Sequence, residues 1–375
     1  MILNRRSFLK KALTAGSIVA GTGPFLSACS RTHRLGLPDR SRLQPKAGQL
    51  DQVGSTILYY ASLAPSGHNS QPWYVRIVNR NEWIIGADPQ RRLPAVDPDN
   101  REVMLSIGAF AENLSIAAGT FGLKAELEVI AEDPFERDIV RICLKKAKPV
   151  DYPLRRILQR MTAKHGYFPD RIKKEDVRAL SESLKGHLFY FPRGTEHAKC
   201  IEEGVIENFR IQAYRDNAQL ETVRWMRLSN KDAERYHDGL TVEGMEINGI
   251  KGWFVKNFVK PRDFMKSNFR KQSVEHTAKL TRQGGGWFVI TSKGRTVADL
   301  VETGRRFERM ALKARERKIA VQPMTQYLEE KSGQKQIAEN HEPGVTPQFI
   351  LRVGYLNIYP DPVSLRRPVA WFVRS

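Results

Sequence analysis

The stretch from Ala64 to Trp73 reads APSGHNSQPW and gathers several side chains that donate or accept hydrogen bonds. Its two prolines exclude a helix interior or a central strand, so the stretch is predicted to be an irregular loop. Gly67 lets the backbone approach a ligand closely. Ser66, Asn69 and Gln71 could then read the edge of a planar heterocycle. An ordinary helix-to-strand connection, with polar side chains capping backbone groups, explains the same residues equally well.

Other chemistries find less support in the sequence. Ser66 and His68 are two residues apart on this loop and no GxSxG motif surrounds them, which argues against a hydrolase. The glycines at 284–286 precede a predicted strand and match neither GxxxxGKS/T nor GxGxxG, which indicates a turn rather than a phosphate loop. The eight histidines show no HExxH motif and no paired spacing, so no metal site is predicted.

The composition indicates a folded, strongly basic protein. The chain has 375 residues, of which 41% are hydrophobic, enough to bury a sizeable core. Its 61 lysines and arginines exceed its 41 acidic residues, for a formal charge of +20. These cations are scattered along the chain and no nucleic-acid-binding motif accompanies them, so no nucleic-acid partner is expected. Diffuse positive charge is typical of a solvated surface or of one near anionic lipid.

The N-terminal residues are predicted to be an export signal. The sequence NRRSFLKK from Asn4 resembles the twin-arginine export motif. The weakly apolar run that follows, up to Leu26, is too short and too polar to span a membrane stably. The sequence LSAC ending at Cys29 resembles a lipobox, in which the cysteine is acylated. We therefore interpret residues 1–29 as the signal and residues 30–50 as a linker.

These signals predict a periplasmic protein attached to a membrane through a lipid on Cys29. The alternative is an amphipathic N-terminal helix with a chance cysteine. Twin-arginine export carries proteins that are already folded, often with a cofactor inserted. Two further cysteines, Cys143 and Cys200, could form a single bridge in an oxidising compartment. Cys143 lies in a strand-like run and is more simply explained as a buried small hydrophobe.

Hydrophobic periodicity predicts an α+β fold in two halves, residues 51–150 and 151–375. Helices are expected at 52–63, 106–121, 154–164, 174–184, 200–226 and 297–318. Strands are expected at 73–79, 82–87, 124–130, 139–144, 187–191, 287–291 and 347–354. Residues 227–269 form a charged, aromatic-dotted insertion without a clear period.

Four stretches resemble motifs of the flavin-dependent nitroreductase family. The first loop resembles its APSxxNxQPW motif. Residues 92–102, RLPAVDPDNRE, followed by SIGA at 106–109 and by Asn113-Leu114, are similar to the pattern RxLxxxDPxxRE…SxGAxxxNL of the Acg-like branch. More weakly, residues 154–168 look like the family's opening RRSxRxF element. Gly354-Tyr355-Leu356 followed by Arg366-Arg367-Pro368 looks like its closing GYP…RRP.

The resemblance implies FMN as cofactor and a nitroreductase-like fold. In ordinary members two basic elements bind the FMN phosphate, while the APSxxNxQPW loop of the other subunit holds the ring. The order of these elements here implies a monomeric, fused pseudo-dimer with mixed or antiparallel sheets packed by helices. The residues that the resemblance places at the cofactor are Pro65, Ser66, Asn69, Gln71, Arg101, Arg160, Thr162, Lys164, Gln322, Pro323, Met324, Arg366 and Arg367.

These residues have different expected roles. Arg160, Thr162 and Lys164 would act with Arg366 and Arg367 on the phosphate, although Lys164 replaces the usual arginine. Arg101 would lie near the flavin N1 and C2 carbonyl, or else form an ion pair within the protein. Residues 322–324 would present backbone amides toward N5.

The resemblance further implies an oxidoreductase with ping-pong electron transfer through flavin N5 to a small acceptor, such as a nitro compound or a quinone. Usual family members take hydride from NAD(P)H, whereas an exported protein would need a quinol or a redox partner. The alternative is a protein that sequesters, stores or senses FMN beneath a closed lid. The insertion at 227–269, from Asp238 through Phe264 in particular, is the predicted lid.

Overall fold

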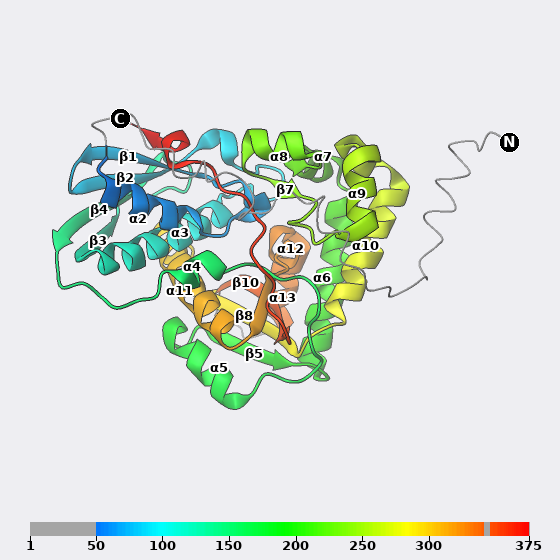
Figure 1. Ribbon diagram of the computed structural model, residues 1–375. Helices are drawn as coiled ribbons and strands as arrows, with labels where there is room; N and C mark the ends of the chain where they lie inside the picture. The colour runs from blue at the N-terminus through cyan, green and yellow to red at the C-terminus, as the bar shows by residue number, and fades with distance from the viewer. Residues whose placement is uncertain (1–49, 341–345, 375) are drawn as a thin grey trace. The chain divides into compact units, whose positions relative to one another are not determined.

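The computed structural model describes residues 50–340 and 346–374, which form a mixed α+β fold with two main sheets (Figure 1). The twin-arginine motif, Cys29 and nearly all of the linker predicted at 30–50 lie outside the described residues. Cys143 and Cys200 are both free, so the predicted alternative of a bridge between them is wrong.

The first sheet has five strands in the order β11-β1-β2-β4-β3. Its strands are β1 (Trp73–Asn79), β2 (Glu82–Ala87), β3 (Leu123–Val129), β4 (Asp138–Lys146) and β11 (Val373–Arg374). The first four are antiparallel, and β11 pairs in parallel with β1 through Val75 and Val373. The last described residues of the chain therefore extend a sheet that is otherwise built from its first half.

The helices of the first half are α2 (Gln52–Ser62) and α3 (Arg101–Thr120), and a short 3₁₀ turn, η3 (Gly67–Asn69), follows α2. Asp51 starts α2 by accepting a hydrogen bond from Gly54 N at 2.7 Å. The Asp97 carboxylate accepts from the backbone N–H groups of Glu102 and Val103 at the start of α3. This cap explains why α3 begins at Arg101 rather than at the predicted residue 106.

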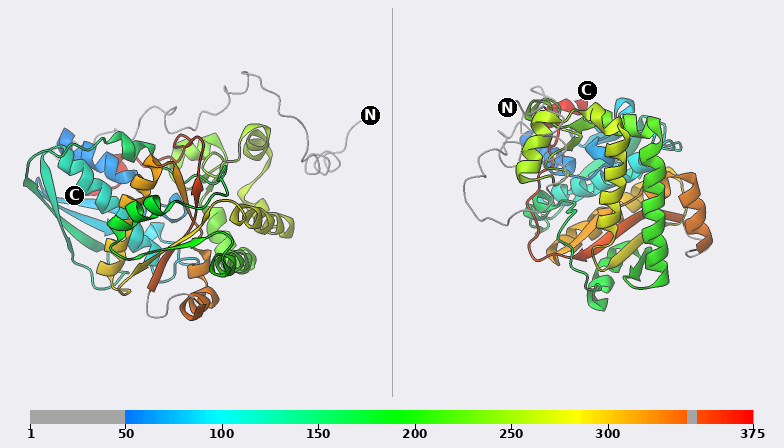
Figure 2. Two further views of the ribbon diagram at one scale, coloured as in Figure 1. Left: turned by 90° about the horizontal axis from the view of Figure 1, so that it is seen from below. Right: turned by 90° about the vertical axis from the view of Figure 1, so that its right-hand side faces the viewer.

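The second sheet has four antiparallel strands in the order β5-β8-β10-β9. They are β5 (Leu188–Pro192), β8 (Gly286–Ser292), β9 (Ile319–Pro323) and β10 (Thr346–Tyr355). The helices of this part are α4 (Arg155–Gln159), α5 (Lys174–Ser181), α6 (Glu196–Tyr214), α10 (Ser267–Thr281), α11 (Val297–Glu316), α12 (Gln326–Glu329) and α13 (Lys331–Asn340). The long helices α6 and α10 pack against each other (Figure 2, right).

The insertion at 227–269 is more regular than its sequence indicated. It follows α7 (Asp216–Arg224) and contains α8 (Asn230–Tyr236) and α9 (Gly249–Phe258). The short strands β6 (Met226–Arg227) and β7 (Leu240–Thr241) pair in parallel across α8. Ser229 caps α8 by accepting from Asp232 N. Short helices of this kind leave no long period in the sequence, which is why periodicity did not find them.

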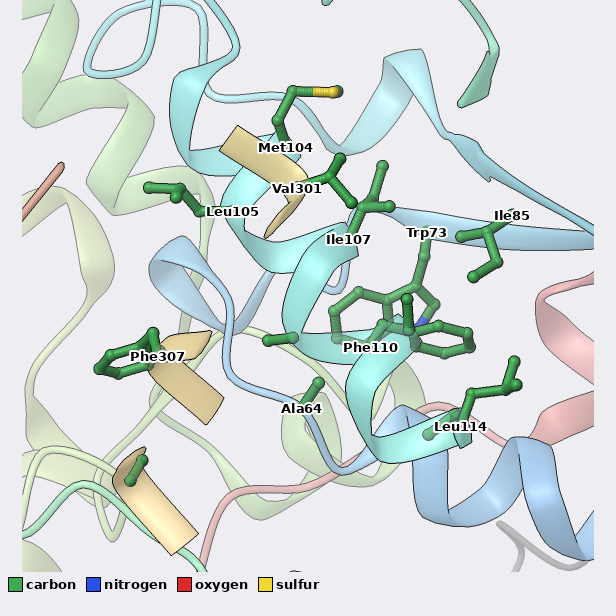
Figure 3. Close-up of a cluster of buried hydrophobic side chains, with 14 of the residues drawn as sticks. Ala64, Trp73, Ile85, Met104, Leu105, Ile107, Phe110, Leu114, Val301 and Phe307 are labelled. Atoms are coloured by element: carbon green, nitrogen blue, oxygen red, sulfur yellow. The ribbon is translucent and has the colours of Figure 1, made fainter. Parts of the chain in front are cut away.

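The 20-residue helices α3 and α11 pack against each other at the centre of the main core. Gly108 of α3 and Gly304 of α11 let the two backbones meet, since a Cβ at either position would lie 2.0 Å from a carbonyl oxygen of the other helix. Figure 3 shows Trp73 against Phe110 of α3 in this core, with the ring centroids 5.0 Å apart. Helix α3 is long and apolar enough to span a membrane. However, 78% of its apolar stretch is buried inside the protein, as in a core helix.

Most elements of the sequence prediction are confirmed, β1 and β2 residue for residue. The helix predicted at 154–164 is wrong beyond Gln159, because α4 ends there and Arg160 is extended. The reason is tertiary, since Lys164 N donates to the Glu246 carboxylate at 2.8 Å instead of to a helix carbonyl. The helix predicted at 200–226 is divided into α6 and α7 at Arg215.

The close approach of α3 and α11 predicts that Gly108→Ala destabilises the protein by about 3 kcal/mol, because the new methyl group overlaps the Val301 carbonyl. Gly119→Ala on the same helix is the matched control. Its methyl would lie 3.5 Å from Val150, an ordinary contact, so it should leave stability unchanged or raise it by up to about 1 kcal/mol. Urea unfolding of both variants measures the difference, and equal stabilities would contradict this packing.

Candidate functional site

The loop from Ala64 to Pro72 joins α2 to β1 in an unusual backbone conformation. His68, Asn69 and Gln71 have φ angles of 51°, 51° and 52°, in the left-handed region that side chains other than glycine rarely adopt. Such residues persist only where their surroundings hold them, at a cost of about 1–3 kcal/mol each. Gln71 is fully buried, and its backbone N donates to Ser66 Oγ at 2.9 Å. This loop is therefore held by specific contacts.

Arg366 provides one set of these contacts. Its guanidinium donates to Asn69 Oδ1 at 2.8 Å and to the carbonyls of Leu63 and Ala64 at 3.2 and 3.1 Å. These carbonyls follow the C-terminus of α2, where a cation is favoured by the helix dipole. The buried guanidinium thus fixes the start of the loop.

Arg367 provides the second set. Its backbone N donates to Gln71 Oε1 at 2.8 Å, and its guanidinium donates to the carbonyls of Gln71 and Trp73, both at 2.7 Å. Burial lowers the pKa of Arg367 to about 9, which leaves it charged at neutral pH. Two arginines near the C-terminus therefore bind the loop nearly 300 positions earlier in the chain.

Residues 237–246, which we term the cover segment, contact the other side of the loop. Gln71 Nε2 donates to His237 O at 2.8 Å. Asn69 exchanges two hydrogen bonds with Gly239, through its backbone O at 3.2 Å and its side-chain Nδ2 at 3.3 Å. Asp238 is buried between Arg91 and Arg227, each 2.9 Å away. The cover segment is thus anchored to the loop by amides and by a buried carboxylate.

The far end of the cover segment contacts Lys164. The Lys164 ammonium donates to Gly244 O, and its backbone N donates to Glu246 Oε1. Glu246 Oε2 also pairs with His165 at 2.8 Å. Burial lowers the pKa of Lys164, and the Glu246 carboxylate opposes this shift. The cover segment therefore bridges the loop and the basic element that the sequence placed at the FMN phosphate.

Backbone strain is concentrated in these two segments. In the part of the chain that the structure describes, eight residues other than glycine have positive φ angles. Five of the eight are His68, Asn69 and Gln71 of the loop and His237 and Glu246 of the cover segment. Strain of this kind clusters at ligand clamps and switch regions, which makes the junction of loop and cover segment the strongest candidate site.

A buried ion pair lies beside the α2 end of the loop. Arg160 Nε is 3.3 Å from Glu308 Oε1 on α11, and Arg160 Nη2 donates to the same Leu63 carbonyl that Arg366 binds. Burial raises the pKa of the Glu308 carboxyl, and Arg160 opposes the rise. Asn113 approaches this carboxylate without reaching hydrogen-bond geometry. Among the described residues neither Arg160 Nε nor the Glu308 oxygens have a hydrogen-bond partner, so this cluster is only partly satisfied.

Another buried arginine, Arg352, connects Lys164 to β9. Its guanidinium donates to Lys164 O and to Gln322 Oε1, and it lies 4.1 Å from the ring of Tyr167. Met324 N donates to Ile350 O at 2.8 Å, so this amide belongs to the sheet. Arg352 was missed in the sequence, although an arginine within the apolar run FILRVG is a visible signal.

Arg101 lies at a different place, beside a cavity of about 790 Å³. It donates to Gln348 O at 2.6 Å and pairs with Glu102 at 3.0 Å, the alternative role that the sequence left open. Glu102 in turn lies under the loop, because a Cβ on Gly67 would be 2.9 Å from its Oε2. Glu329 also lines the cavity, and burial followed by the Glu102 charge raises its pKa. The described residues that line the cavity do not include the loop, so the loop approaches it only through the contact of Gly67 with Glu102, the neighbour of Arg101.

The structure thus brings together some of the residues that the sequence selected. Asn69, Gln71, Arg366 and Arg367 are joined directly, Arg160 and Arg366 share one carbonyl, and Arg352 connects Lys164 with Gln322. Four other predicted residues are neighbours of these in the sequence. Pro65, Thr162 and Pro323 are half-buried, and Met324 is buried. The sequence missed Glu308, Arg352 and Glu246. Glu308 could have been noticed because it follows Gly304 by one turn on the buried face of α11.

Comparison with known proteins gives a local similarity. No model of a protein family matches the chain. Over 82 residues the chain is 34% identical to proteins from two strains of Mycobacterium tuberculosis, each named a putative NAD(P)H nitroreductase. The match covers 22% of this chain and 23% of each relative. A crystal structure of a nitroreductase-like family protein from Bacillus cereus aligns with 60% of this chain and 97% of its own, at 11% identity and a TM-score of 0.35.

The environment of Asp97 predicts a pH dependence of stability. Burial and the nearby Glu102 carboxylate raise the pKa of Asp97 to about 7. A carboxyl with a higher pKa in the folded chain takes up a proton on folding, so its contribution to stability falls as pH rises from about 4 to about 7. Asp97→Asn keeps an oxygen for the α3 cap and removes this titration. The free energy of unfolding of the wild type minus that of the variant should fall by about 3 kcal/mol over this range.

Urea unfolding at several pH values measures this difference. The matched control is Asp99→Asn. Asp99 is exposed and, like Asp97, lines the cavity beside Arg101. A difference between wild type and Asp97→Asn that stays constant with pH would show that the Asp97 carboxyl is not perturbed in this way.

Proposed function

We propose that the protein binds FMN and acts as an oxidoreductase of nitroreductase type, with two fused halves, residues 51–150 and 151–375, contributing to one cofactor site in a monomer. The observation that carries this proposal is the direct binding of the Ala64–Pro72 loop by Arg366 and Arg367. These are the two elements that the sequence resemblance assigns to opposite ends of the same cofactor. The local similarity to proteins named nitroreductases supports it.

The charged residues at the α2 end of the loop fit a phosphate. Arg160 and Arg366 are buried at this end, where both bind the Leu63 carbonyl. Arg367 is buried at the β1 end of the loop, and Lys164 is half-buried against the cover segment. Glu308 is the carboxylate paired with Arg160, and its own oxygens lack hydrogen bonds among the described residues. Buried cations in excess over carboxylates are costly unless an anion accompanies them. A phosphate accepts charge-assisted hydrogen bonds from arginine and lysine, so it would satisfy this cluster.

The opposite end of the loop fits a flat ring. Gly67 lets the backbone lie against Glu102, close to the cavity that Arg101 and Gln348 line. The amides of Asn69 and Gln71 offer donors to ring carbonyls. In this structure those donors bind the carbonyls of Gly239 and His237 on the cover segment.

When bound, FMN would supply hydride acceptance and the return of electrons to a small acceptor, such as a nitro compound or a quinone, in ping-pong order. The chain's part is to bind and orient. Arg160, Lys164 and Arg366 would hold the phosphate, and Arg101 would place a positive charge beside the ring where negative charge accumulates. The cover segment would exclude water from the site.

Export by the twin-arginine pathway and acylation of Cys29 form part of this proposal. The electron donor would then be a quinol or a redox partner in the periplasm, and NAD(P)H only if the protein acts in the cytoplasm. The two relatives carry NAD(P)H in their names, which favours that donor for them.

The phosphate assignment predicts that Lys164→Met weakens FMN binding by about 10- to 100-fold, because one charge-assisted hydrogen bond is lost. The purified wild type should be yellow and release one FMN per chain on denaturation. Riboflavin, which has no phosphate, should bind the variant and the wild type equally. The matched control is Lys124→Met, at an exposed position of β3. A colourless protein that takes up no added FMN, or an equal loss for riboflavin, would contradict the assignment.

A second candidate function is favoured by the anchored cover segment, namely FMN sequestration beneath a closed lid. Its carbonyls already occupy the Asn69 and Gln71 donors that a ring would use. An enzyme should lose its flavin colour quickly with a suitable donor and regain it with an acceptor. A sequestering protein should keep the flavin oxidised with every donor tested.

The variant Asp238→Asn provides a second way to distinguish the enzyme from the sequestering protein. It removes the carboxylate that is buried between Arg91 and Arg227. Release of the cover segment should accelerate flavin reduction by a small reductant by at least about tenfold if this segment limits access. Asp232→Asn, at the start of α8, is the control. Stopped-flow absorbance measures the rates. Unchanged reduction in Asp238→Asn would exclude the cover segment as a barrier.

A further inference from the structure

Helix α9 carries a row of apolar side chains that face solvent. Ile250, Trp253 and Phe258 are 76%, 53% and 58% exposed. Ile250, the half-buried Phe254 and Phe258 follow one another four residues apart, and Trp253 comes three residues after Ile250, so these side chains lie on neighbouring parts of the helix surface. Trp253 and Phe258 contact edge to face, and Phe254 contacts Phe258, so the aromatic rings form one continuous surface. Isolated exposed hydrophobic residues are normal, but a contiguous apolar surface marks an interaction site.

The orientation of α9 is fixed by its other side. Val255 and Val259 pack into a small core with Val242 and Met245 (Figure 1 labels α9 at the right). Gly252 lies so close to the Ile247 carbonyl that a Cβ would be 2.3 Å from it. The helix therefore cannot rotate to bury its aromatic row, and the row is exposed because the fold places it there.

The surroundings of this row are strongly basic. Residues 247–271 contain seven lysines and arginines and one acidic residue, Asp263. Lys256 is paired with Glu243, and Arg270 with Asp216. The others are exposed: Lys251, Lys260, Arg262, Lys266 and Lys271. Lys266 is paired with Asp263, which leaves the exposed charge predominantly positive.

We infer that α9 binds the surface of an anionic lipid bilayer, with Ile250, Trp253 and Phe258 in the interfacial region and the basic side chains against lipid headgroups. A helix with aromatic residues on one side and lysines around it is typical of an interfacial membrane helix. Anionic lipid complements the positive charge, whereas a second copy of this surface would repel it. This surface uses none of the side chains proposed to hold FMN, and the inference does not depend on FMN.

Binding of α9 to a bilayer would affect the cover segment, because the two are in direct contact. Lys256 of α9 pairs with Glu243, and Gly252 packs on Ile247 just after it. The cover segment would therefore lie next to the membrane, where lipid-soluble quinols are dissolved. This arrangement gives an electron donor of that class a short path to the proposed site.

The test is vesicle co-sedimentation of the full chain carrying Cys29→Ser, so that no acyl anchor contributes. Binding to vesicles of equimolar phosphatidylcholine and phosphatidylglycerol should exceed binding to phosphatidylcholine alone and should fall with rising salt. The double variant Ile250→Ser/Phe258→Ser should bind at least about tenfold more weakly. Phe135→Ser, which replaces a 54% exposed phenylalanine of the first half, is the matched control and should bind as the wild type does.

A spectroscopic readout locates the contact. Brominated lipid in the same vesicles should quench the tryptophan fluorescence, and Trp253→Phe should lose most of this quenching while it still binds. Unchanged binding of the double variant, or unchanged quenching of Trp253→Phe, overturns the inference. Concentration-dependent self-association without lipid that the double variant abolishes would assign the surface to a second copy of the chain, and would overturn it as well.

Discussion

The binding of buried arginines to main-chain carbonyls is the interaction on which the arrangement of this chain depends. Arg366 and Arg367 are almost completely buried, and their guanidinium groups bind carbonyls at the end of α2 and the start of β1. A buried cation is tolerated only where its donors are satisfied. Because these carbonyls flank the Ala64–Pro72 loop, the C-terminal stretch must return to the first sheet, where Val373 pairs with Val75. One set of contacts therefore shapes the loop and closes the fold.

The same contacts explain how the loop tolerates its backbone strain. Three left-handed residues would be unstable in an isolated loop, since each costs about 1–3 kcal/mol. Two of them, Asn69 and Gln71, each have a side chain bound both to the C-terminal arginine region and to the cover segment. His68 instead contacts Thr222 of α7 at 3.2 Å, and burial lowers the pKa of its imidazole, so it is held as a neutral side chain. These contacts come from outside the loop, and only the folded chain supplies them.

This dependence on distant contacts separates what the sequence could predict from what it could not. The strands β1 and β2 were predictable because β-branched and aromatic residues flank a turn in which Asn79 Oδ1 accepts from Asn81 N. The loop itself was predictable from its prolines. The end of α4 was not, because the backbone after Gln159 bonds to Glu246, more than 80 residues later. Single buried charges such as Glu308 and Arg352 have partners that only the tertiary structure defines.

The cover segment lies between the Ala64–Pro72 loop and α9 and contacts both. On one side its carbonyls satisfy the Asn69 and Gln71 amides, and on the other Glu243 pairs with Lys256 of α9. A ring that uses the same amides must displace these carbonyls, so its apparent affinity is reduced by the free energy with which the cover segment docks. Any force that shifts α9 changes that free energy, because Gly252 has no space to move independently of Ile247. If α9 binds a bilayer and the loop binds a ligand as proposed, the two events would be coupled through the cover segment, and by linkage each would alter the affinity of the other by the same factor.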